Sequence, residues 1–344
     1  MNMEKNRKQF WKKYSLQIAL ALLLAVILVT LAGWWLYFRV LEQSSLDEGR
    51  SGREYARHYV MITDDTSSEL WKKIYESAKK EGENQDAWVE MMGDWFADEY
   101  SPMDYMDIAI YAKADGIIVK PDGTQKMRDA INEAEEAGIP VITVLEDDTR
   151  SARKSFVGIN SYQLGTTYGN QILSCLNPDT RSVLVLLNGK DAGRELVFKQ
   201  LKATVQEGIS EERQITVQAM TVDSGNSFDT EEIIQDIFAE EKRPHILVCM
   251  NETDSERAYQ AMIDHNCVGE VQIIGYYQSG TMLQAVQKGT VPMAITLDAE
   301  QMGKYCVEAL EEYYQMGHVS SYFSVDLNIM TQENVDQFIA QEEG

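Results

Sequence analysis

The sequence contains 344 residues, of which 44% are apolar, and it carries a formal net charge of -24 at pH 7. This length and this apolar fraction suffice for two domains with separate cores. So acidic a surface disfavours nucleic acid as a partner, because the phosphates would repel it. The acidity otherwise serves solubility and says little about the chemistry of a ligand.

The amino-terminal end has the charge and hydropathy pattern of a membrane anchor. Residues 1–15 form a basic tail, and residues 16–38 are apolar apart from Gln17 and Thr30. As a helix, this span can cross roughly 30 Å of hydrocarbon. Because basic residues stay on the cytoplasmic side, we expect a single-pass protein of the cell membrane, with residues 39–344 in the extracellular or periplasmic space.

A cleaved signal peptide is the alternative interpretation of this end. Leu31-Ala32-Gly33 looks like the start of a lipoprotein cleavage site, but Trp34 follows where the lipid-bearing cysteine would stand. No small-x-small cleavage pattern follows Phe38. We therefore favour an uncleaved anchor, with residues 39–54 as a polar linker to the outer part of the chain.

The outer part begins with a predicted strand at Tyr59–Thr63, followed by a helix. Asp64 and Asp65 come at the carboxyl end of the strand. Thr66 opens the helix, and Thr66 with Glu69 has the spacing of a capping box. The elements expected next are a strand at Trp88–Met92 and a helix at Pro102–Ala112.

Residues 113–148 have the pattern of one strand–helix–strand unit. Ile117–Val119 and Val141–Leu145 are β-branched runs typical of strands that are buried on both faces. Between them, apolar positions share one helical face, so a right-handed parallel crossover is expected. Ligands of parallel sheets lie beyond the carboxyl ends of the strands, which here are Lys120–Thr124 and Glu146–Thr149.

The alternation of strand and helix pauses near residues 158–163, after a strand at Phe156–Ile159, and then starts again. This alternation specifies an α/β fold in which helices cover both faces of parallel sheets. The sequence therefore predicts two doubly wound, Rossmann-like parallel-sheet lobes preceded by one transmembrane helix. The strands of the second run are expected at Val183–Leu187, Ile215–Val222, His245–Met250, Val271–Tyr276, Met293–Thr296 and Tyr322–Leu327.

Signatures of metal, cofactor and catalytic sites are missing from the sequence. Cys175, Cys249, Cys267 and Cys306 lack metal-ligand spacing, and the four histidines are scattered. There is no G-x-G-x-x-G after a strand, no phosphate loop and no G-x-S-x-G. We therefore predict no metal, no cofactor and no enzymatic activity. Cys249 lies in an apolar run and is expected to be buried.

Several short motifs occur along the outer part of the chain. They are Ala114–Val119, Ala137–Ile142, Val157–Asn160, Asn251-Glu252, Ile273–Tyr276, Val286–Gly289 and Glu300–Gly303. Together, and in this order, they resemble the type I periplasmic binding proteins of ribose and related sugars, which share their fold with the ligand domain of lactose-repressor-type regulators. The resemblance covers roughly residues 55–335.

This resemblance implies two lobes joined by a hinge of three crossings, with a ligand held between the lobes and hinge closure on binding. The crossings should fall near residues 158–163, 295–300 and 317–325. The amino-terminal lobe would then comprise residues 55–160 and 297–319. The carboxyl-terminal lobe would comprise residues 161–296 and 320–340.

The resemblance also implies which residues bind the ligand. Carboxylates, amides and an arginine at the strand ends suit the paired hydrogen bonds of a small polar solute, such as a sugar or polyol. From the first lobe these residues are Asp64, Asp65, Thr66, Asp94, Trp95, Glu146, Asp147 and Asn160. From the second lobe they are Arg194, Asn251, Tyr277 and Asp298 or its neighbour Leu297.

Some positions depart from the sugar-binding pattern of the family. Thr66, Ser67 and Ser68 stand where aromatic residues are usual at the start of the first helix, and Tyr277 replaces an Asp. Leu145-Glu146 replaces an Asp-Arg pair. The ligand identity is therefore open, and aromatic side chains can supply stacking in place of the missing hydroxyl clamps.

Structural roles are the alternative for several of these residues. Asp64 and Asp65 would cap the following helix, Arg194 would pair with a surface acid, Asn251 would hold a turn, and Tyr277 would pack in the wall.

Two functions fit the sequence. The first is a membrane-anchored solute-binding protein that delivers its ligand to the permease of a sugar-type ABC importer. The alternative is a sensing module that reports the ligand to a membrane histidine kinase or a receptor partner. The sequence offers no cytoplasmic signalling domain, so the second function requires a partner chain.

Overall fold

The structure is a computed structural model that describes residues 55–93, 100–188, 192–210, 212–222, 227–239 and 243–342. Tyr55–Gly344 forms one compact unit. The basic tail, the transmembrane segment 16–38 and the linker 39–54 predicted above lie outside the described residues. Within the described ranges, no helix combines the length and the apolar character needed to cross a membrane.

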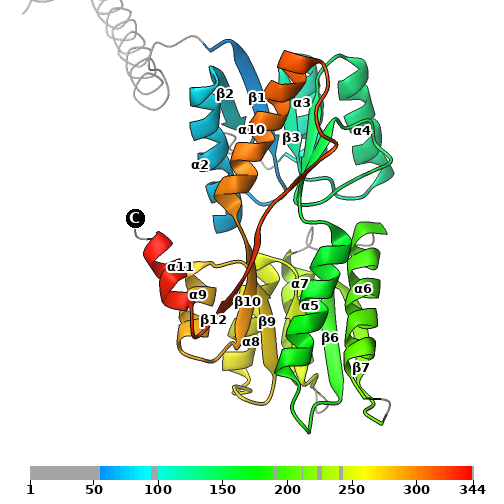
Figure 1. Cartoon of the computed structure of the whole chain (residues 1–344), viewed down its shortest axis with the longest axis vertical. Helices are drawn as coiled ribbons and strands as arrows, with labels where there is room; N and C mark the ends of the chain where they lie inside the picture. Colours follow the sequence, from blue (N-terminus) through cyan, green and yellow to red (C-terminus); the bar gives the residue numbers. More distant parts are fainter. Residues whose placement is uncertain are drawn as a thin grey trace, which may run out of the picture. The chain divides into compact units, whose positions relative to one another are not determined.

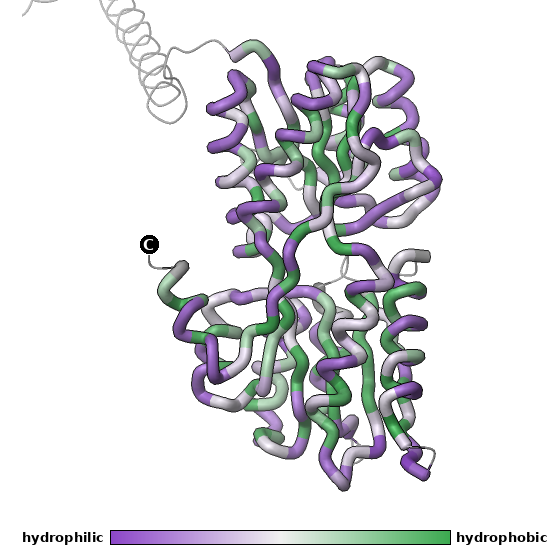
Figure 2. The backbone as a smooth tube through the Cα atoms, in the orientation of Figure 1, coloured by the Kyte–Doolittle hydropathy of each residue, from purple (hydrophilic) through white to green (hydrophobic). Residues whose placement is uncertain are grey.

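The first lobe is built on a parallel sheet with the strand order β11-β5-β4-β3-β1-β2. Every residue of β3 and β4 is buried, as expected for strands that helices cover on both faces. Figure 2 shows these strands as largely hydrophobic. The strands are β1 (Arg57–Ile62), β2 (Ala87–Met91), β3 (Gly116–Val119), β4 (Val141–Val144), β5 (Ser155–Gly158) and β11 (Tyr322–Ser324).

Two pairs of helices cover the first sheet (Figure 1). α2 (Glu69–Asn84) and α10 (Ala299–Met316) pack on one face, and α3 (Pro102–Ala112) and α4 (Gln125–Glu136) on the other. The backbones of α2 and α10 approach so closely that a Cβ on Gly303 would lie 2.1 Å from the carbonyl oxygen of Ile74. Gly303 is therefore required for this contact.

The second lobe repeats the arrangement with the strand order β12-β10-β9-β8-β6-β7, in which β12 is antiparallel to β10. α5 and α6 cover one face, and α7, α8 and α9 cover the other. The strands are β6 (Ser182–Asn188), β7 (Thr216–Val222), β8 (Ile246–Cys249), β9 (Gln272–Tyr276), β10 (Met293–Leu297) and β12 (Leu327–Thr331). The helices are α5 (Ser161–Cys175), α6 (Ala192–Gly208), α7 (Ser227–Ala239), α8 (Glu252–Asp264), α9 (Gly280–Gln287) and α11 (Val335–Glu342).

The chain passes between the lobes after β5, after β10 and between β11 and β12 (Figure 1). The third passage falls at Val325 and Asp326, because β11 pairs in parallel with β5 of the first sheet. The assignment of residues 320–340 as a whole to the second lobe is therefore corrected. The ring of Tyr322 in β11 stacks on Phe156 of β5, with centroids 5.6 Å apart, which holds this short edge strand on the first lobe.

Two local expectations have clear outcomes. Cys249 is buried, and all four cysteines are free thiols. The capping box of Thr66 with Glu69 is wrong, because Ser68 caps α2 and accepts a hydrogen bond from Trp71 N. The backbone N–H groups of Ser67 and Ser68 donate to Asp65, and this turn delays the start of the helix.

Candidate functional site

A cavity of about 930 Å³ lies between the two lobes. Its lining includes residues that follow β1, β3, β4 and β5 in the first lobe, residues that follow β6 and β8 in the second lobe, and Tyr276 at the end of β9. These are the carboxyl ends of parallel strands, where α/β sheets bind their ligands. The volume falls within the range of roughly 300–1,000 Å³ that is typical of small-molecule sites.

The structure brings most of the predicted site residues together at this cavity. The residues that line it are Asp64, Asp65, Glu146, Asp147, Asn160, Arg194 and Asn251. Thr66, Tyr277 and Asp298 are not among its lining residues. Asp94 and Trp95 lie outside the described residues.

Tyr277 and Asp298 have structural roles instead. The side chain of Tyr276 reaches the cavity, so the next side chain, that of Tyr277, points to the other side of the chain and packs in the core cluster that contains Leu297. Tyr277 is 1% exposed and has a positive φ of 67°. Asp298 caps α10, where its carboxylate accepts a hydrogen bond of 2.8 Å from Gln301 N.

Asp64 and Lys120 form an ion pair in the first-lobe wall of the cavity. They follow the neighbouring strands β1 and β3, and the Lys120 ammonium lies 2.9 Å from both carboxylate oxygens of Asp64. Burial is the largest single influence and acts to raise the pKa of Asp64, but the charge and hydrogen bonds of Lys120, together with the Arg194 charge, lower the pKa below its usual value. Burial likewise opposes the charge of Lys120, whose pKa is nevertheless raised by Asp64 and Glu146.

This pair gives a pH-dependent prediction. Because the pKa of Asp64 is lowered on folding, the pair stabilises the protein above the ordinary pKa of an aspartate, and this stabilisation is lost as the pH falls. We expect Asp64→Asn to have a lower free energy of unfolding than wild type near neutral pH. This difference should become smaller as the pH is lowered to about 3. Urea denaturation of both proteins across this range measures it. A difference that does not depend on pH would show that Asp64 does not act through its charge.

Arg194 and Glu146 connect the two lobes across the cavity. Arg194 lies in the first turn of α6 in the second lobe, and Glu146 follows β4 in the first lobe. The Arg194 guanidinium donates a hydrogen bond to Glu146. The alternative role predicted for Arg194 was an ion pair with a surface acid. Arg194 does form an ion pair, but its partner Glu146 lines the same cavity.

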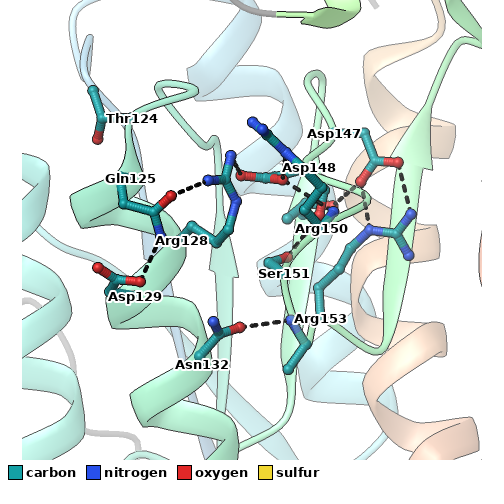
Figure 3. A network of polar contacts seen from close by, with 12 residues as sticks. Thr124, Gln125, Arg128, Asp129, Asn132, Asp147, Asp148, Arg150, Ser151 and Arg153 are labelled. Carbon is teal, nitrogen blue, oxygen red and sulfur yellow. Dashed lines mark hydrogen bonds and ion pairs between the residues drawn. The ribbon is translucent and has the colours of Figure 1, made fainter.

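The loop that carries Glu146 is held by two further ion pairs (Figure 3). Asp148 lies 2.7 Å from Arg128 of α4, and both side chains are almost completely buried. Asp147 accepts two hydrogen bonds from Arg153, which donates a third, of 3.0 Å, to the carbonyl of Ser321. The loop is thereby fixed to α4 and to the segment before β11.

Asn160 and Asn251 cap the helices that follow them. The Asn160 side chain accepts a hydrogen bond of 2.8 Å from Tyr162 N at the start of α5. Asn251 accepts from Asp254 N and donates to the Asp254 carboxylate, both at 2.7 Å. The structural role expected for Asn251 is therefore present, and both side chains also border the cavity.

Sequence reasoning missed several residues of the cavity wall. Lys120 lies at a predicted strand end, but a lysine there has no sequence signal beyond its position. The aromatic side chains in the wall are Trp71, Phe156, Tyr276 and Tyr322. Trp71 lies in the core cluster of the first lobe and also borders the cavity.

This wall is suited to hydrogen bonding with a small polar molecule. Its main charges are internally paired, and the side chains between them offer carboxylates, amides, hydroxyls and aromatic faces to a bound molecule. Within the described ranges, no group of three His, Cys, Asp or Glu residues could hold a metal ion.

Comparison with known proteins places the fold among solute-binding proteins. A family model described as periplasmic binding protein domain matches residues 59–317. The glucose-galactose binding protein GanP from Geobacillus stearothermophilus has a similar structure, with a TM-score of 0.72 and 19% sequence identity. The match covers 81% of this chain and 98% of GanP. A comparison with the curated proteins gives no match.

Two other solved structures are similar over the same region. A solute-binding protein of an ABC transporter from Agrobacterium vitis, bound with α-D-tagatopyranose, has a TM-score of 0.71 and 16% identity, covering 83% of this chain and 98% of its own. XylFII in the XylFII-LytSN complex has a TM-score of 0.69 and 22% identity, covering 80% of this chain and 98% of its own. At these identities the likeness shows the fold.

Proposed function

The chain belongs to the periplasmic binding protein family, as its resemblance to the type I members predicted. We propose that it binds a small polar solute between its lobes and closes around it. The solute is a sugar, a polyol or a molecule of similar size and polarity. The observation that supports this most directly is the cavity of about 930 Å³ at the strand ends of both lobes.

The chemistry of the wall supports a neutral, hydroxylated solute. In the Asp64–Lys120 pair and in the Arg194–Glu146 pair, the positive charge of one side chain balances the negative charge of the other. Both pairs still offer hydrogen-bond donors and acceptors to hydroxyl groups of a solute. Trp71 and Tyr276 supply the apolar surface that sugar rings stack on. The similar structures support the same class of solute, since their names describe glucose-galactose binding and a bound tagatopyranose.

The site residues in this proposal are the predicted ones that line the cavity, together with Lys120 and Tyr276. Catalysis is not part of the proposal, because the family to which the chain belongs is one of binding proteins.

We further propose that the protein is held at the outer face of the cell membrane by an uncleaved helix at residues 16–38 and delivers its solute to the permease of an ABC importer. The support is the 23-residue apolar span after a basic tail in the sequence. An anchor of this kind keeps a binding protein near its permease and raises its effective concentration there.

Sensing is a second candidate function, and one observation favours it. XylFII, which has the same fold, is found in a complex with LytSN. A membrane-anchored binding protein can report closure to a neighbouring kinase in the same way that it can present a closed form to a permease.

The binding proposal predicts a thermal shift. We expect the chain to unfold at a higher temperature in the presence of at least one compound from a panel of sugars, polyols and nucleosides, because a ligand that binds only the folded form stabilises it. At a concentration of roughly 100 Kd the expected stabilisation is about 2.7 kcal/mol. A panel with no shift would count against the proposal.

Cross-linking in native membranes, with and without the compound that gives the thermal shift, then distinguishes a permease partner from a kinase partner.

A further inference from the structure

The first turn of α2 is capped partly by the other lobe. Within its own lobe, Ser68 accepts a hydrogen bond from Trp71 N. The two backbone N–H groups before Trp71, those of Glu69 and Leu70, instead donate to the Glu252 carboxylate of the second lobe at 3.1 Å and 3.2 Å. The Ser68 hydroxyl donates to the same carboxylate. Glu252 therefore binds the start of a helix to which it does not belong.

The reverse contact joins the same regions. Glu69, the first residue of α2, accepts a hydrogen bond of 2.9 Å from Gly280 N, the first residue of α9 in the second lobe. Each lobe thus presents a glutamate to a helix start in the other lobe. A third contact, 3.3 Å from the Thr253 hydroxyl to Asp65, lies beside them.

Carboxylates at helix starts make strong contacts for two reasons. The first-turn N–H groups have no partner within their own helix, and the helix dipole places partial positive charge there. Glu252 is 7% exposed, so water screens these contacts little. Because all the partners are protein groups, the contacts depend on the position of the lobes and not on the chemistry of a solute.

We propose that Glu252 and Glu69 form a reciprocal latch that holds the two lobes closed, with Glu252 as a positioning residue for the binding site. The latch rests on the proposed solute binding, since it sets how the cavity opens to admit a solute. Opening exposes the first-turn N–H groups of α2 to water and separates Glu252 from them. The latch therefore raises the closed fraction of the protein, and these contacts must break before the lobes separate.

The size of the effect follows from the hydrogen bonds that Glu252 accepts. Removing its carboxylate deletes three charge-assisted hydrogen bonds between the lobes, and we expect the ratio of closed to open protein to fall on the order of 10- to 100-fold. Glu252→Gln keeps an acceptor oxygen but loses the charge, so its effect should be smaller than that of Glu252→Ala.

The matched control is Glu256→Ala. Glu256 lies on α8 one turn after Glu252, also borders the cavity and carries the same charge. Its carboxylate accepts a hydrogen bond from the Ser279 hydroxyl, which belongs to the same lobe. Removing it changes the charge of the cavity by the same amount without deleting a hydrogen bond between the lobes.

The test measures the distance between the lobes in the full chain without any solute. A pair of fluorescent dyes is attached at Glu83→Cys on α2 and Asp264→Cys on α8, both exposed positions, in a protein that also carries Cys175→Ser. Because burial raises the pKa of Glu252, the measurement is made at about pH 8, where the carboxylate is ionised. We expect lower energy transfer in Glu252→Ala than in wild type and in Glu256→Ala.

Chemical rescue makes the test specific. Added sodium formate should restore energy transfer in Glu252→Ala, because the small carboxylate can take the place of the missing one at the start of α2, while sodium chloride at the same ionic strength should not. Wild-type energy transfer in Glu252→Ala would overturn the latch, as would an equal loss in Glu256→Ala. If Glu252→Ala does not fold, Glu252→Gln decides by the same readout. A panel of solutes without a thermal shift would reject the binding proposal and leave this result intact.

Discussion

Replacing Asp148 by alanine is expected to lower the free energy of unfolding by about 3–5 kcal/mol, because it leaves a buried arginine without its counterion. The side chains of Asp148 and Arg128 expose only 6% and 9% of their surface and lie 2.7 Å apart. The pair also ties the loop after β4 to α4, so the destabilisation extends to the loop that carries Glu146 (Figure 3). Urea denaturation followed by tryptophan fluorescence measures the change.

Arg150→Ala is the control for this variant. Arg150 contacts the same carboxylate at 3.7 Å, but its side chain is 66% exposed, so its removal should change stability by about 0–1 kcal/mol. The double variant Arg128→Met/Asp148→Leu should recover much of the lost stability, because two apolar side chains replace two buried charges. Equal destabilisation in Asp148→Ala and Arg150→Ala would mean that burial of the Arg128 pair is not what stabilises the loop.

The elements of the fold could be predicted from the sequence because buried parallel strands leave a strong local pattern. The pattern predicts a strand at Ile117–Val119, and the structure has Gly116–Val119. The resemblance to the binding proteins, together with the rule that ligands lie at carboxyl strand ends, predicted Asp64, Glu146 and Asn251 as site residues, and all three line one cavity although they come from separate strands. Predicting such residues requires only the correct topology, because all strands of a parallel sheet end at the same edge.

The remaining site residues depend on features that a strand pattern does not contain. Tyr277 is one residue beyond the strand end that faces the cavity, and a shift of one residue moves a side chain to the opposite face. The pattern places Lys120 at the edge of the sheet but does not assign it a role, since that role comes from Asp64 on the neighbouring strand. Glu252 contacts the other lobe, which no local pattern encodes.

The departure from the sugar-binding pattern at the start of the first helix has a structural explanation. Where the pattern has aromatic residues, this chain has Ser67 and Ser68, whose N–H groups donate to Asp65. Ser68 then caps α2 and reaches Glu252. The turn thus forms contacts between the lobes in place of a stacking surface, and Trp71 on the same helix borders the cavity instead.

Reversing the charge of Glu146 is expected to weaken solute binding on the order of 100-fold or more. In the closed protein Glu146 accepts a hydrogen bond from Arg194 of the other lobe. Glu146→Arg would bring two guanidinium groups together, and this repulsion opposes the closure on which binding depends. Isothermal titration calorimetry, with the compound that gives the thermal shift, measures the change in affinity. Glu133→Arg makes the same charge change at an exposed position of α4 and should bind normally.

The exchanged pair Glu146→Arg/Arg194→Glu separates bridging from direct contact. If the two side chains act by joining the lobes, the exchange restores their attraction and should recover most of the affinity, because each charge again faces its opposite. If they bind the solute directly, the exchange places both groups at the wrong positions and the double variant binds as poorly as the single one. Recovery therefore assigns Arg194 and Glu146 to closure, and continued weak binding assigns them to recognition of the solute.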